Sequence, residues 1–271
     1  MSTTRRSLQL SAAAASALAA PAARAEITAP VKLWEGFASP VGMGFDAGGN
    51  LYVAEWSAGR VSRITPDGRR SIFAEGLSGP SGLAIGADGA IYVASYSRDE
   101  VYRFTPQGER SVHVAGLATP AGLSFDRAGR LLVANRRTNQ ILAVTGSNGL
   151  EPVVEGLRTP IGAVQTRDGG FVVANFGGGV TIVRPDGGRI EADAAFRTPG
   201  AGVVQARDGR VFVVDYGGTT VREILMEGAS RAVADGLSSP VDLVLSPDDR
   251  ALLTATWGDG AIYRIAVPKL E

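Results

Sequence analysis

The stretch GFASPVG at residues 36–42 returns as GLSGPSG at residues 76–82. Its proline recurs along the whole chain at a nearly constant interval. The six prolines are Pro40, Pro80, Pro120, Pro160, Pro199 and Pro240, spaced by 40, 40, 40, 39 and 41 residues. A fixed period of this length is the sequence signature of a repeat architecture. The chain is therefore built from six copies of one unit.

Each unit contains four short apolar segments separated by turn residues. In the second copy they are Leu83–Ile85, Ile91–Ala94, Val101–Phe104 and Ser111–Val114. Their Val, Ile, Phe and Tyr content favours strands, and the Asp-Gly and Pro-x-Gly sequences between them are typical of tight turns. A β-solenoid is the alternative, but its coils are shorter and carry no hairpin turns. The pattern predicts an all-β fold, a six-bladed β-propeller of four-stranded antiparallel blades.

The two ends of the repeat region complement each other. The sixth copy has strands near Val241–Leu245, Ala251–Ala255 and Ala261–Val267, and no fourth strand follows. At the other end, Val31–Trp34 precedes the first Gly-Phe motif as a fourth strand precedes that motif in other copies. We expect this N-terminal strand to complete the sixth blade, a three-plus-one closure that hides two exposed sheet edges.

Residues 1–25 resemble a targeting segment. They contain the pair Arg5-Arg6, an alanine-rich run and the small residues Ala23-Arg24-Ala25 before a cleavage point. The twin arginine predicts a Tat signal, with an ordinary Sec signal as the alternative. We expect a periplasmic or secreted protein in which residues 26–271 form a single propeller domain.

The net charge and the hydropathy of the chain exclude some classes of binding partner. Without the three arginines of the targeting segment, 24 basic residues face 27 acidic ones, a net charge of −3. A nucleic-acid-binding surface calls for a basic stripe, and a membrane span calls for about 20 consecutive apolar residues. We therefore expect a monomer with no nucleic-acid partner and no membrane span. The chain has no cysteine, which removes thiol nucleophiles and zinc-thiolate sites.

From Val31 to Val267 the repeated text, Pro-x-Gly followed by Asp-Gly, an apolar Tyr-Val-Ala-type strand and Pro-x-Gly again, resembles the NHL repeat. NHL-type six-bladed propellers are similar to streptogramin lyases, to the gluconolactonase group and to binding modules without catalytic activity. The resemblance implies the fold and does not choose among these functions.

The gluconolactonase resemblance implies one divalent cation, calcium or magnesium, on the axis. Its ligands would stand one residue before the glycine of Pro-x-Gly. Here those positions hold Val41, Ser81, Ala121, Ile161, Ala201 and Val241. None offers the carboxylate or amide oxygen that such a cation prefers, so no cofactor is predicted.

The lyase resemblance implies histidines on the propeller face and carboxylates that hold magnesium. The single histidine, His113, lies in an outer strand where other copies carry apolar residues. We interpret it as a packing residue, which weakens the case for a lyase with a histidine base.

Two adjacent positions after the second strand of each blade are candidate site residues, because the loops there share one face with the blade-to-blade connections. The first position holds Glu55, Ser95, Asn135, Asn175, Asp215 and Thr256. The second holds Trp56, Tyr96, Arg136, Phe176, Tyr216 and Trp257. Asp242 is a further candidate, since it replaces the glycine found in most copies.

Each position has a structural and a functional interpretation. Glu55, Asn135, Asn175 and Asp215 either accept backbone N–H bonds within their loops or point into a shared pocket. The aromatic side chains either seal one blade against the next or form stacking surfaces around the channel mouth. On the functional interpretation the ligand lies nearest blades 5, 6 and 1.

These observations favour an exported propeller that binds a small molecule, a sugar or a peptide at the channel mouth. The alternative is a hydrolase or lyase that acts on a lactone or a similar small molecule, with clustered carboxyl groups as acid and base.

Overall fold

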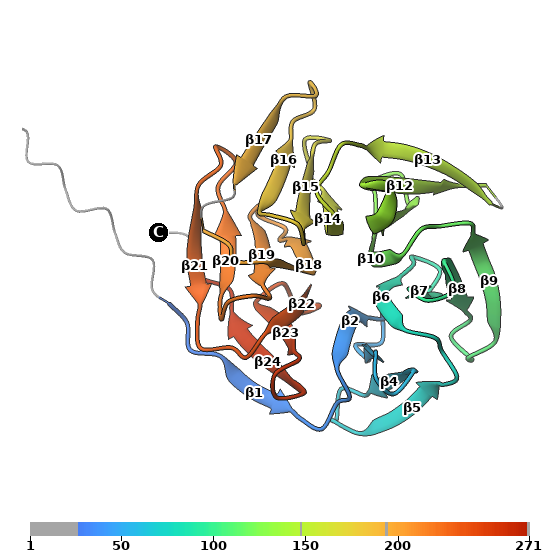
Figure 1. Cartoon of the computed structure of the whole chain (residues 1–271). Coiled ribbons are helices and arrows are strands. Elements are labelled where there is room, and N and C mark those ends of the chain that lie inside the picture. The colour runs from blue at the N-terminus through green and yellow to red at the C-terminus, as the bar shows by residue number, and fades with distance from the viewer. Residues whose placement is uncertain (1–26, 147, 193–194, 270–271) are drawn as a thin grey trace, which may run out of the picture.

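In the computed structural model, which describes residues 27–146, 148–192 and 195–269, six four-stranded sheets surround a central axis (Figure 1). The predicted targeting segment lies outside the described residues. The strands are β1 (Val31–Trp34), β2 (Pro40–Phe45), β3 (Leu51–Glu55), β4 (Arg60–Ile64), β5 (Arg70–Ala74), β6 (Pro80–Ile85), β7 (Ile91–Ser95), β8 (Glu100–Phe104), β9 (Arg110–Ala115), β10 (Pro120–Phe125), β11 (Leu131–Asn135), β12 (Gln140–Thr145), β13 (Gly149–Val154), β14 (Pro160–Gln165), β15 (Phe171–Asn175), β16 (Val180–Val183), β17 (Arg189–Ala192), β18 (Pro199–Gln205), β19 (Val211–Asp215), β20 (Val221–Ile224), β21 (Ser230–Ala234), β22 (Pro240–Leu245), β23 (Ala251–Thr256) and β24 (Ala261–Ala266).

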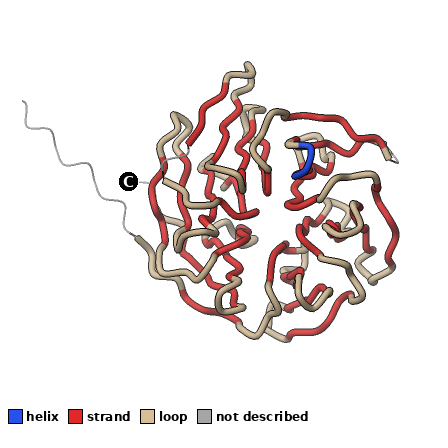
Figure 2. The backbone as a smooth tube through the Cα atoms, in the orientation of Figure 1, coloured by secondary structure: helices blue, strands red, loops and turns tan. Residues whose placement is uncertain are grey.

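The predicted six-bladed architecture is confirmed. Blades 1 to 5 are the sheets β2–β5, β6–β9, β10–β13, β14–β17 and β18–β21, each antiparallel and each with its first strand innermost. Figure 2 shows that loops and strands make up nearly all of the described chain, apart from the short 3-10 helix η1 (Arg136–Thr138). No helix in the described ranges has the length and apolarity needed to cross a bilayer.

The predicted closure of the ring is also confirmed. Blade 6 has the strand order β22-β23-β24-β1, so the N-terminal strand supplies its outer edge. Val31 pairs with Arg264 and Lys32 with Tyr263 in antiparallel register. The Lys32 ammonium also lies 3.1 Å from the Asp259 carboxylate, which ties β1 to the loop between β23 and β24.

The hydrophobic core lies in the seams between blades. One seam joins Tyr52 and Val61 of blade 1 to Leu83 and Ile91 of blade 2, all nearly inaccessible to solvent. Close to the axis, glycines let the innermost strands approach one another, since a Cβ atom added at Gly42 would lie 2.5 Å from Leu83 N. The result is a narrow axis walled by the six innermost strands.

Candidate ligand-binding site

Each blade brings the end of its second strand next to the start of its innermost strand, at one end of the axis. In blade 1, Pro40 pairs with Glu55, and Trp56 N donates to Ser39 O at 3.0 Å. The same bond, to the residue before the repeat proline, is made by the N–H groups of Tyr96, Arg136, Phe176 and Trp257. The backbone therefore fixes this repeat position at the channel mouth.

The side chains at this position form a closed ring. Trp56 lies against Tyr96 with ring centroids 5.2 Å apart and against Trp257 at 6.5 Å. Tyr216 joins Trp257 at 5.8 Å and Phe176 at 6.1 Å. The Arg136 guanidinium completes the circle, 5.6 Å from the Tyr96 centroid and 4.9 Å from that of Phe176.

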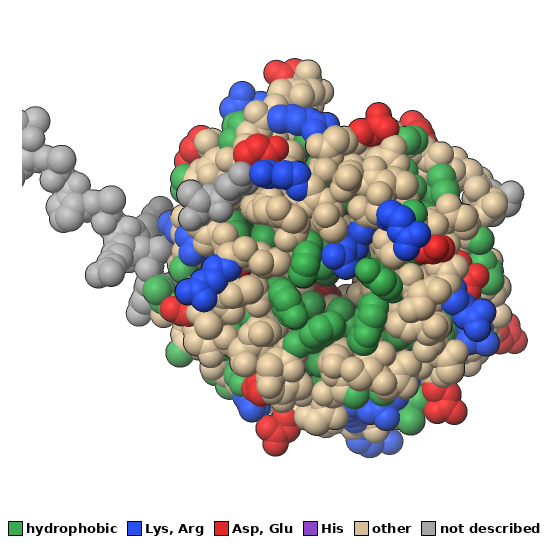
Figure 3. Space-filling view, viewed as in Figure 1, with side chains coloured by type: hydrophobic (Ala, Val, Ile, Leu, Met, Phe, Trp, Pro, Cys, Tyr) green, Lys and Arg blue, Asp and Glu red, His purple; other side chains and the backbone are tan. Residues whose placement is uncertain are grey.

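The ring opens to solvent around the axis. Figure 3 shows apolar side chains gathered around a central hollow, with a basic side chain at its edge. The ring encloses a cavity of about 240 Å³, which we call the cup. Its floor is formed by residues that follow the repeat proline in the innermost strands, Val41, Ser81, Ala121, Ile161, Ala201 and Val241. All six predicted ring residues therefore meet in one cavity.

The ring side chains also contribute to packing. Trp56, Tyr216 and Trp257 pack against the buried cluster between blades 6 and 1. Trp56 lies so close to the proline loop of blade 2 that a Cβ atom added at Gly79 would stand 3.4 Å from its indole. One face of the ring thus seals the blades and the other faces the cup, so the two interpretations of these residues are compatible.

The floor does not suit the axial cation that the gluconolactonase resemblance implies. Five floor residues are apolar, and the sixth, Ser81, donates its hydroxyl to Pro120 O at 2.8 Å. Among the described residues, no group of three or more His, Cys, Asp and Glu side chains could hold a metal ion. Hard cations require several oxygen ligands, and the floor of the cup does not provide them.

Two nitrogen donors of the ring have no acceptor. Within the described ranges, Arg136 Nε and Trp257 Nε1 are buried without a hydrogen-bond partner. Most buried side-chain donors in folded proteins are paired, and an unpaired one costs about 1–3 kcal/mol. Two residues of the cup wall therefore each bury one unpaired nitrogen donor.

The acidic and amide residues at the preceding position do not share the cup. Their side-chain oxygens accept the backbone N–H of the residue two before the repeat proline. The donors are Ala38 N to Glu55 (2.8 Å), Ala118 N to Asn135 (2.7 Å), Arg158 N to Asn175 (3.1 Å) and Arg197 N to Asp215 (3.0 Å). These bonds agree with the structural interpretation of the four residues. The donors belong to the blade-to-blade connection rather than to the residues' own loops.

Glu55 has further partners that fix its charge. Its carboxylate is inaccessible to solvent and accepts bonds from Arg60 (2.9 Å), Arg70 (3.0 Å) and Ser62 (2.5 Å). Burial alone raises the pKa of a carboxyl group. The donors from Arg60, Ala38 N and Ser62, with the charge of Arg70, outweigh burial and lower the pKa of Glu55 to about 2. This carboxylate is an anchor of the scaffold.

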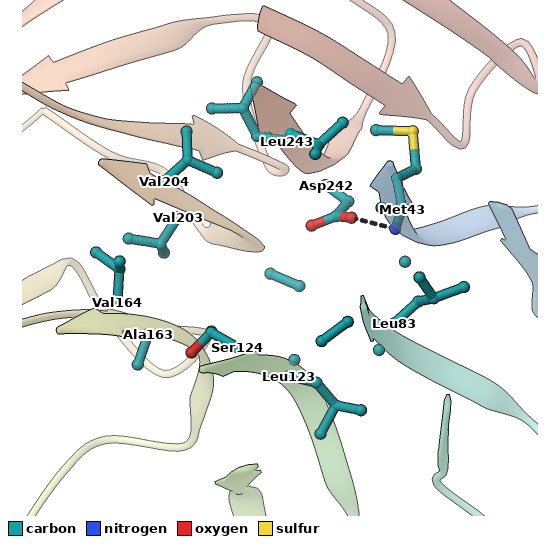
Figure 4. Close-up of a pocket in the computed structure, with 18 of the residues that line it drawn as sticks. Met43, Leu83, Leu123, Ser124, Ala163, Val164, Val203, Val204, Asp242 and Leu243 are labelled. Carbon is teal, nitrogen blue, oxygen red and sulfur yellow. Dashed lines mark hydrogen bonds between the residues drawn. The ribbon is translucent and has the colours of Figure 1, made fainter. Parts of the chain in front are cut away.

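Asp242 lies below the cup. It occupies the position of the inner-strand glycines and lines a second cavity of about 340 Å³, which we call the channel. Figure 4 shows its carboxylate pointing into the channel while Oδ2 accepts from Met43 N of blade 1 at 2.7 Å. Asp242 keeps some accessible surface along the channel, but the innermost strands surround it. Burial raises its pKa to about 7, against the lowering effect of the Leu243 and Met43 N–H groups.

His113 lies in β9, the outermost strand of blade 2, and its ring meets Tyr92 edge-on with centroids 4.9 Å apart. Burial lowers the pKa of the imidazole, and the nearby charge of Arg103 lowers it further. This placement agrees with a packing role and separates His113 from the cup.

Two polar residues that line the channel, Ser124 and Gln205, are not among the predicted site residues. Both belong to innermost strands, and Gln205 Nε2 donates to Gly209 O at 2.9 Å. A polar residue within the otherwise apolar innermost strand was the available signal. Its axis-facing direction depends on strand register, which the repeat alone does not give.

Comparison with known proteins supports the fold. No family model and no curated protein sequence matches this chain. Among solved structures, a gluconolactonase from Xanthomonas campestris is similar with a TM-score of 0.76 and 16% identity, over 93% of this chain and 99% of that one. A calcium-binding regucalcin from Agrobacterium tumefaciens has a TM-score of 0.75 and 15% identity, over 90% and 96%.

A catalytically inactive virginiamycin B lyase from Staphylococcus aureus, solved with quinupristin, has a TM-score of 0.68 and 15% identity, over 87% of this chain and 83% of that one. At such identities the likeness extends to the fold and no further. This chain is thus a six-bladed propeller similar in architecture to gluconolactonase, regucalcin and streptogramin lyase propellers.

Proposed function

We propose that this propeller binds a small molecule in the cup, with the ring side chains as its contacts. The observation that carries the proposal is the closed ring of five aromatic side chains and one guanidinium around a single cavity. Aromatic side chains combine a large apolar contact area with little loss of conformational freedom. The cup of about 240 Å³ is slightly smaller than most ligand pockets, which hold about 300–1,000 Å³. The ligand is therefore small, or extends out of the cup.

The three tryptophans of the chain supply the test. Trp56 and Trp257 belong to the cup, whereas Trp34 belongs to the closing strand β1. Metabolites, sugars and short peptides that raise the melting temperature are titrated while the tryptophan emission is followed. We expect a bound ligand to change the emission. Trp56→Ala or Trp257→Ala should weaken binding by about 1–3 kcal/mol.

Trp34→Phe is the matched control and should leave the affinity unchanged. Melting temperatures of all three variants show whether each protein is folded. A ligand whose affinity survives both cup substitutions would leave the aromatic residues as blade-sealing side chains and refute the proposal.

A hydrolase or lyase is the second candidate, and one observation favours it. Asp242 has a pKa of about 7 inside the channel, and a carboxyl group that titrates near neutrality can exchange protons with a substrate. This function predicts turnover of lactones or related compounds that Asp242→Asn abolishes. Turnover that survives the substitution would exclude Asp242 as the acid or base.

The proposed compartment is the periplasm or the exterior, on the basis of the predicted signal in residues 1–25. Conversion of Arg5 and Arg6 to lysine should retain the precursor in the cytoplasm if the route is Tat. Unimpaired export would favour the Sec route.

A further inference from the structure

Arg136 is the one charged member of the ring, and its position is built by the backbone. It follows β11 and opens η1, and its N–H donates to Thr119 O at 3.3 Å. Its guanidinium lies between the rings of Tyr96 and Phe176. A guanidinium stays protonated at every pH at which proteins are folded. The cup therefore carries a permanent positive charge at blade 3.

This charge lacks the partner that other arginines of the fold have. Arg60 and Arg70 bind Glu55, and Arg130 lies 2.7 Å from Asp126. In the ranges that the structure describes, Arg136 forms no ion pair with a carboxylate, and its Nε has no acceptor. The two carboxylates at the preceding repeat position, Glu55 and Asp215, accept backbone N–H groups of the blade connections instead. The cup therefore has an uncompensated cation and no anion.

The opposite side of the cup is aromatic. Trp56, Tyr216 and Trp257 come from blades 1, 5 and 6 and contact one another edge-on or tilted. Blade 6 stands across the axis from blade 3, so this aromatic wall faces Arg136 across the cup. A ligand that fills the cup thus meets aromatic side chains at one end and a guanidinium at the other.

A cation, a neutral apolar molecule and a carboxylate would interact differently with the cup. A cation would favour the aromatic faces, but Arg136 in the same ring would repel it. A neutral apolar molecule would fill the cup and leave the guanidinium desolvated and unpaired, which is unfavourable. A carboxylate would accept two parallel N–H bonds from the guanidinium. We infer that the cup selects a small molecule in which one flat apolar ring is joined to a carboxylate. This inference rests on the proposed function.

The test uses three probes of nearly equal shape: phenylacetate, phenylacetamide and the phenethylammonium cation. Each is titrated into the full-length protein at constant ionic strength up to about 10 mM. A ligand of about ten non-hydrogen atoms is expected to have a millimolar or lower Kd. Binding is followed by tryptophan emission and by ligand-observed NMR. We expect phenylacetate to bind about 10-fold or more tightly than the amide, as a charge-assisted bidentate contact implies.

Two variants locate the effect. Arg136→Gln keeps a planar polar group without the charge and should reduce the preference for carboxylate over amide to about 1-fold. Arg137→Gln removes the exposed neighbouring charge in η1 and should keep the preference. Melting temperatures show that both variants are folded, and the comparison of probes in the unmodified protein does not depend on them.

The outcomes separate this inference from the proposed function. If the amide or the cation binds as tightly as phenylacetate, or if the preference survives Arg136→Gln, the carboxylate inference is wrong while binding in the cup stands. If none of the probes binds, the carboxylate inference is wrong, whereas the proposed binding of a small molecule in the cup is decided separately by the ligand screen and the Trp56 and Trp257 variants.

Discussion

Glu55 and Asp242 are carboxyl groups in neighbouring blades, both withdrawn from bulk water, and their pKa values move in opposite directions. Glu55 sits behind the cup, where two arginines, a serine and a backbone N–H hold its pKa at about 2. Asp242 sits on the axis, where burial raises its pKa to about 7 against the N–H groups of Leu243 and Met43. Burial raises the pKa of both carboxyl groups, and only Glu55 has enough charged and polar donors to reverse that effect.

The same contrast separates scaffold from site in this molecule. Behind the cup, the side chains of Glu55, Asn135, Asn175 and Asp215 each accept the N–H of a blade connection. On the axis and in the cup, Asp242, Arg136 and Trp257 are left with few or no partners. Groups with perturbed pKa values cluster at functional sites, and Asp242 and Arg136 line the channel and the cup, which adjoin along the axis.

Loss of the Glu55 charge should have the largest effect on stability. Glu55→Gln leaves the partly exposed Arg60 and Arg70 without their common buried partner. Breaking a buried ion pair on one side typically costs about 3–5 kcal/mol. We expect a loss of this size in the free energy of unfolding, measured by denaturant titration. Glu109→Gln in an exposed turn is the control and should change the value by less than about 0.5 kcal/mol.

The pH dependence follows from the lowered pKa of Glu55. Its stabilising effect is present above the unfolded value of 4.5 and is lost as the pH falls toward about 2. The unmodified protein should therefore lose stability in that window more steeply than Glu55→Gln. Equal slopes for the two proteins would show that the arginines do not depend on the Glu55 charge.

Asp242 should show the opposite pH dependence with a smaller effect. Its pKa is raised in the folded state, so the folded protein holds the proton more tightly and loses stability as the pH rises from about 4 to about 7. Asp242→Asn cannot ionise and keeps an oxygen for Met43 N. We expect the variant to be more stable than the unmodified protein by roughly 2–4 kcal/mol at about pH 8 and nearly equal at about pH 4.

Thermal or denaturant unfolding at the two pH values measures this difference. A variant that is no more stable at about pH 8 would mean that Asp242 ionises without cost. Water in the channel would then solvate it, and the contrast with Glu55 would be lost.

The repeat made the architecture predictable because the turn and strand residues recur in the sequence of each blade. The closing strand Val31–Trp34 and the ring residues Trp56 to Trp257 follow from repeat register alone. The direction of Glu55 does not, because the N–H that it binds belongs to the connection 17 residues earlier in the chain. The sequence also does not reveal how few hydrogen bonds Asp242 accepts, since this depends on how closely β22 approaches Met43 of blade 1. Spacing along the chain identifies positions, whereas the partners of a side chain are set by packing between blades.

The smallest effect is expected at Asp215, the blade 5 counterpart of Glu55. Its carboxylate accepts Arg197 N and Thr198 N at 3.0 and 2.9 Å, and these donors are backbone groups rather than arginine side chains. Asn135 and Asn175 make the equivalent bond with an amide oxygen. Asp215→Asn therefore keeps the acceptor and loses only the charge. The free energy of unfolding should fall by about 1 kcal/mol, the net value of one weakened hydrogen bond. Denaturant titration of Asp215→Asn and Glu55→Gln under the same conditions compares their losses in the free energy of unfolding directly. A loss at Asp215 as large as that at Glu55 would mean that this repeat position needs a negative charge. The ion pairs of Glu55 with Arg60 and Arg70 would then no longer distinguish it from the equivalent residues of the other blades.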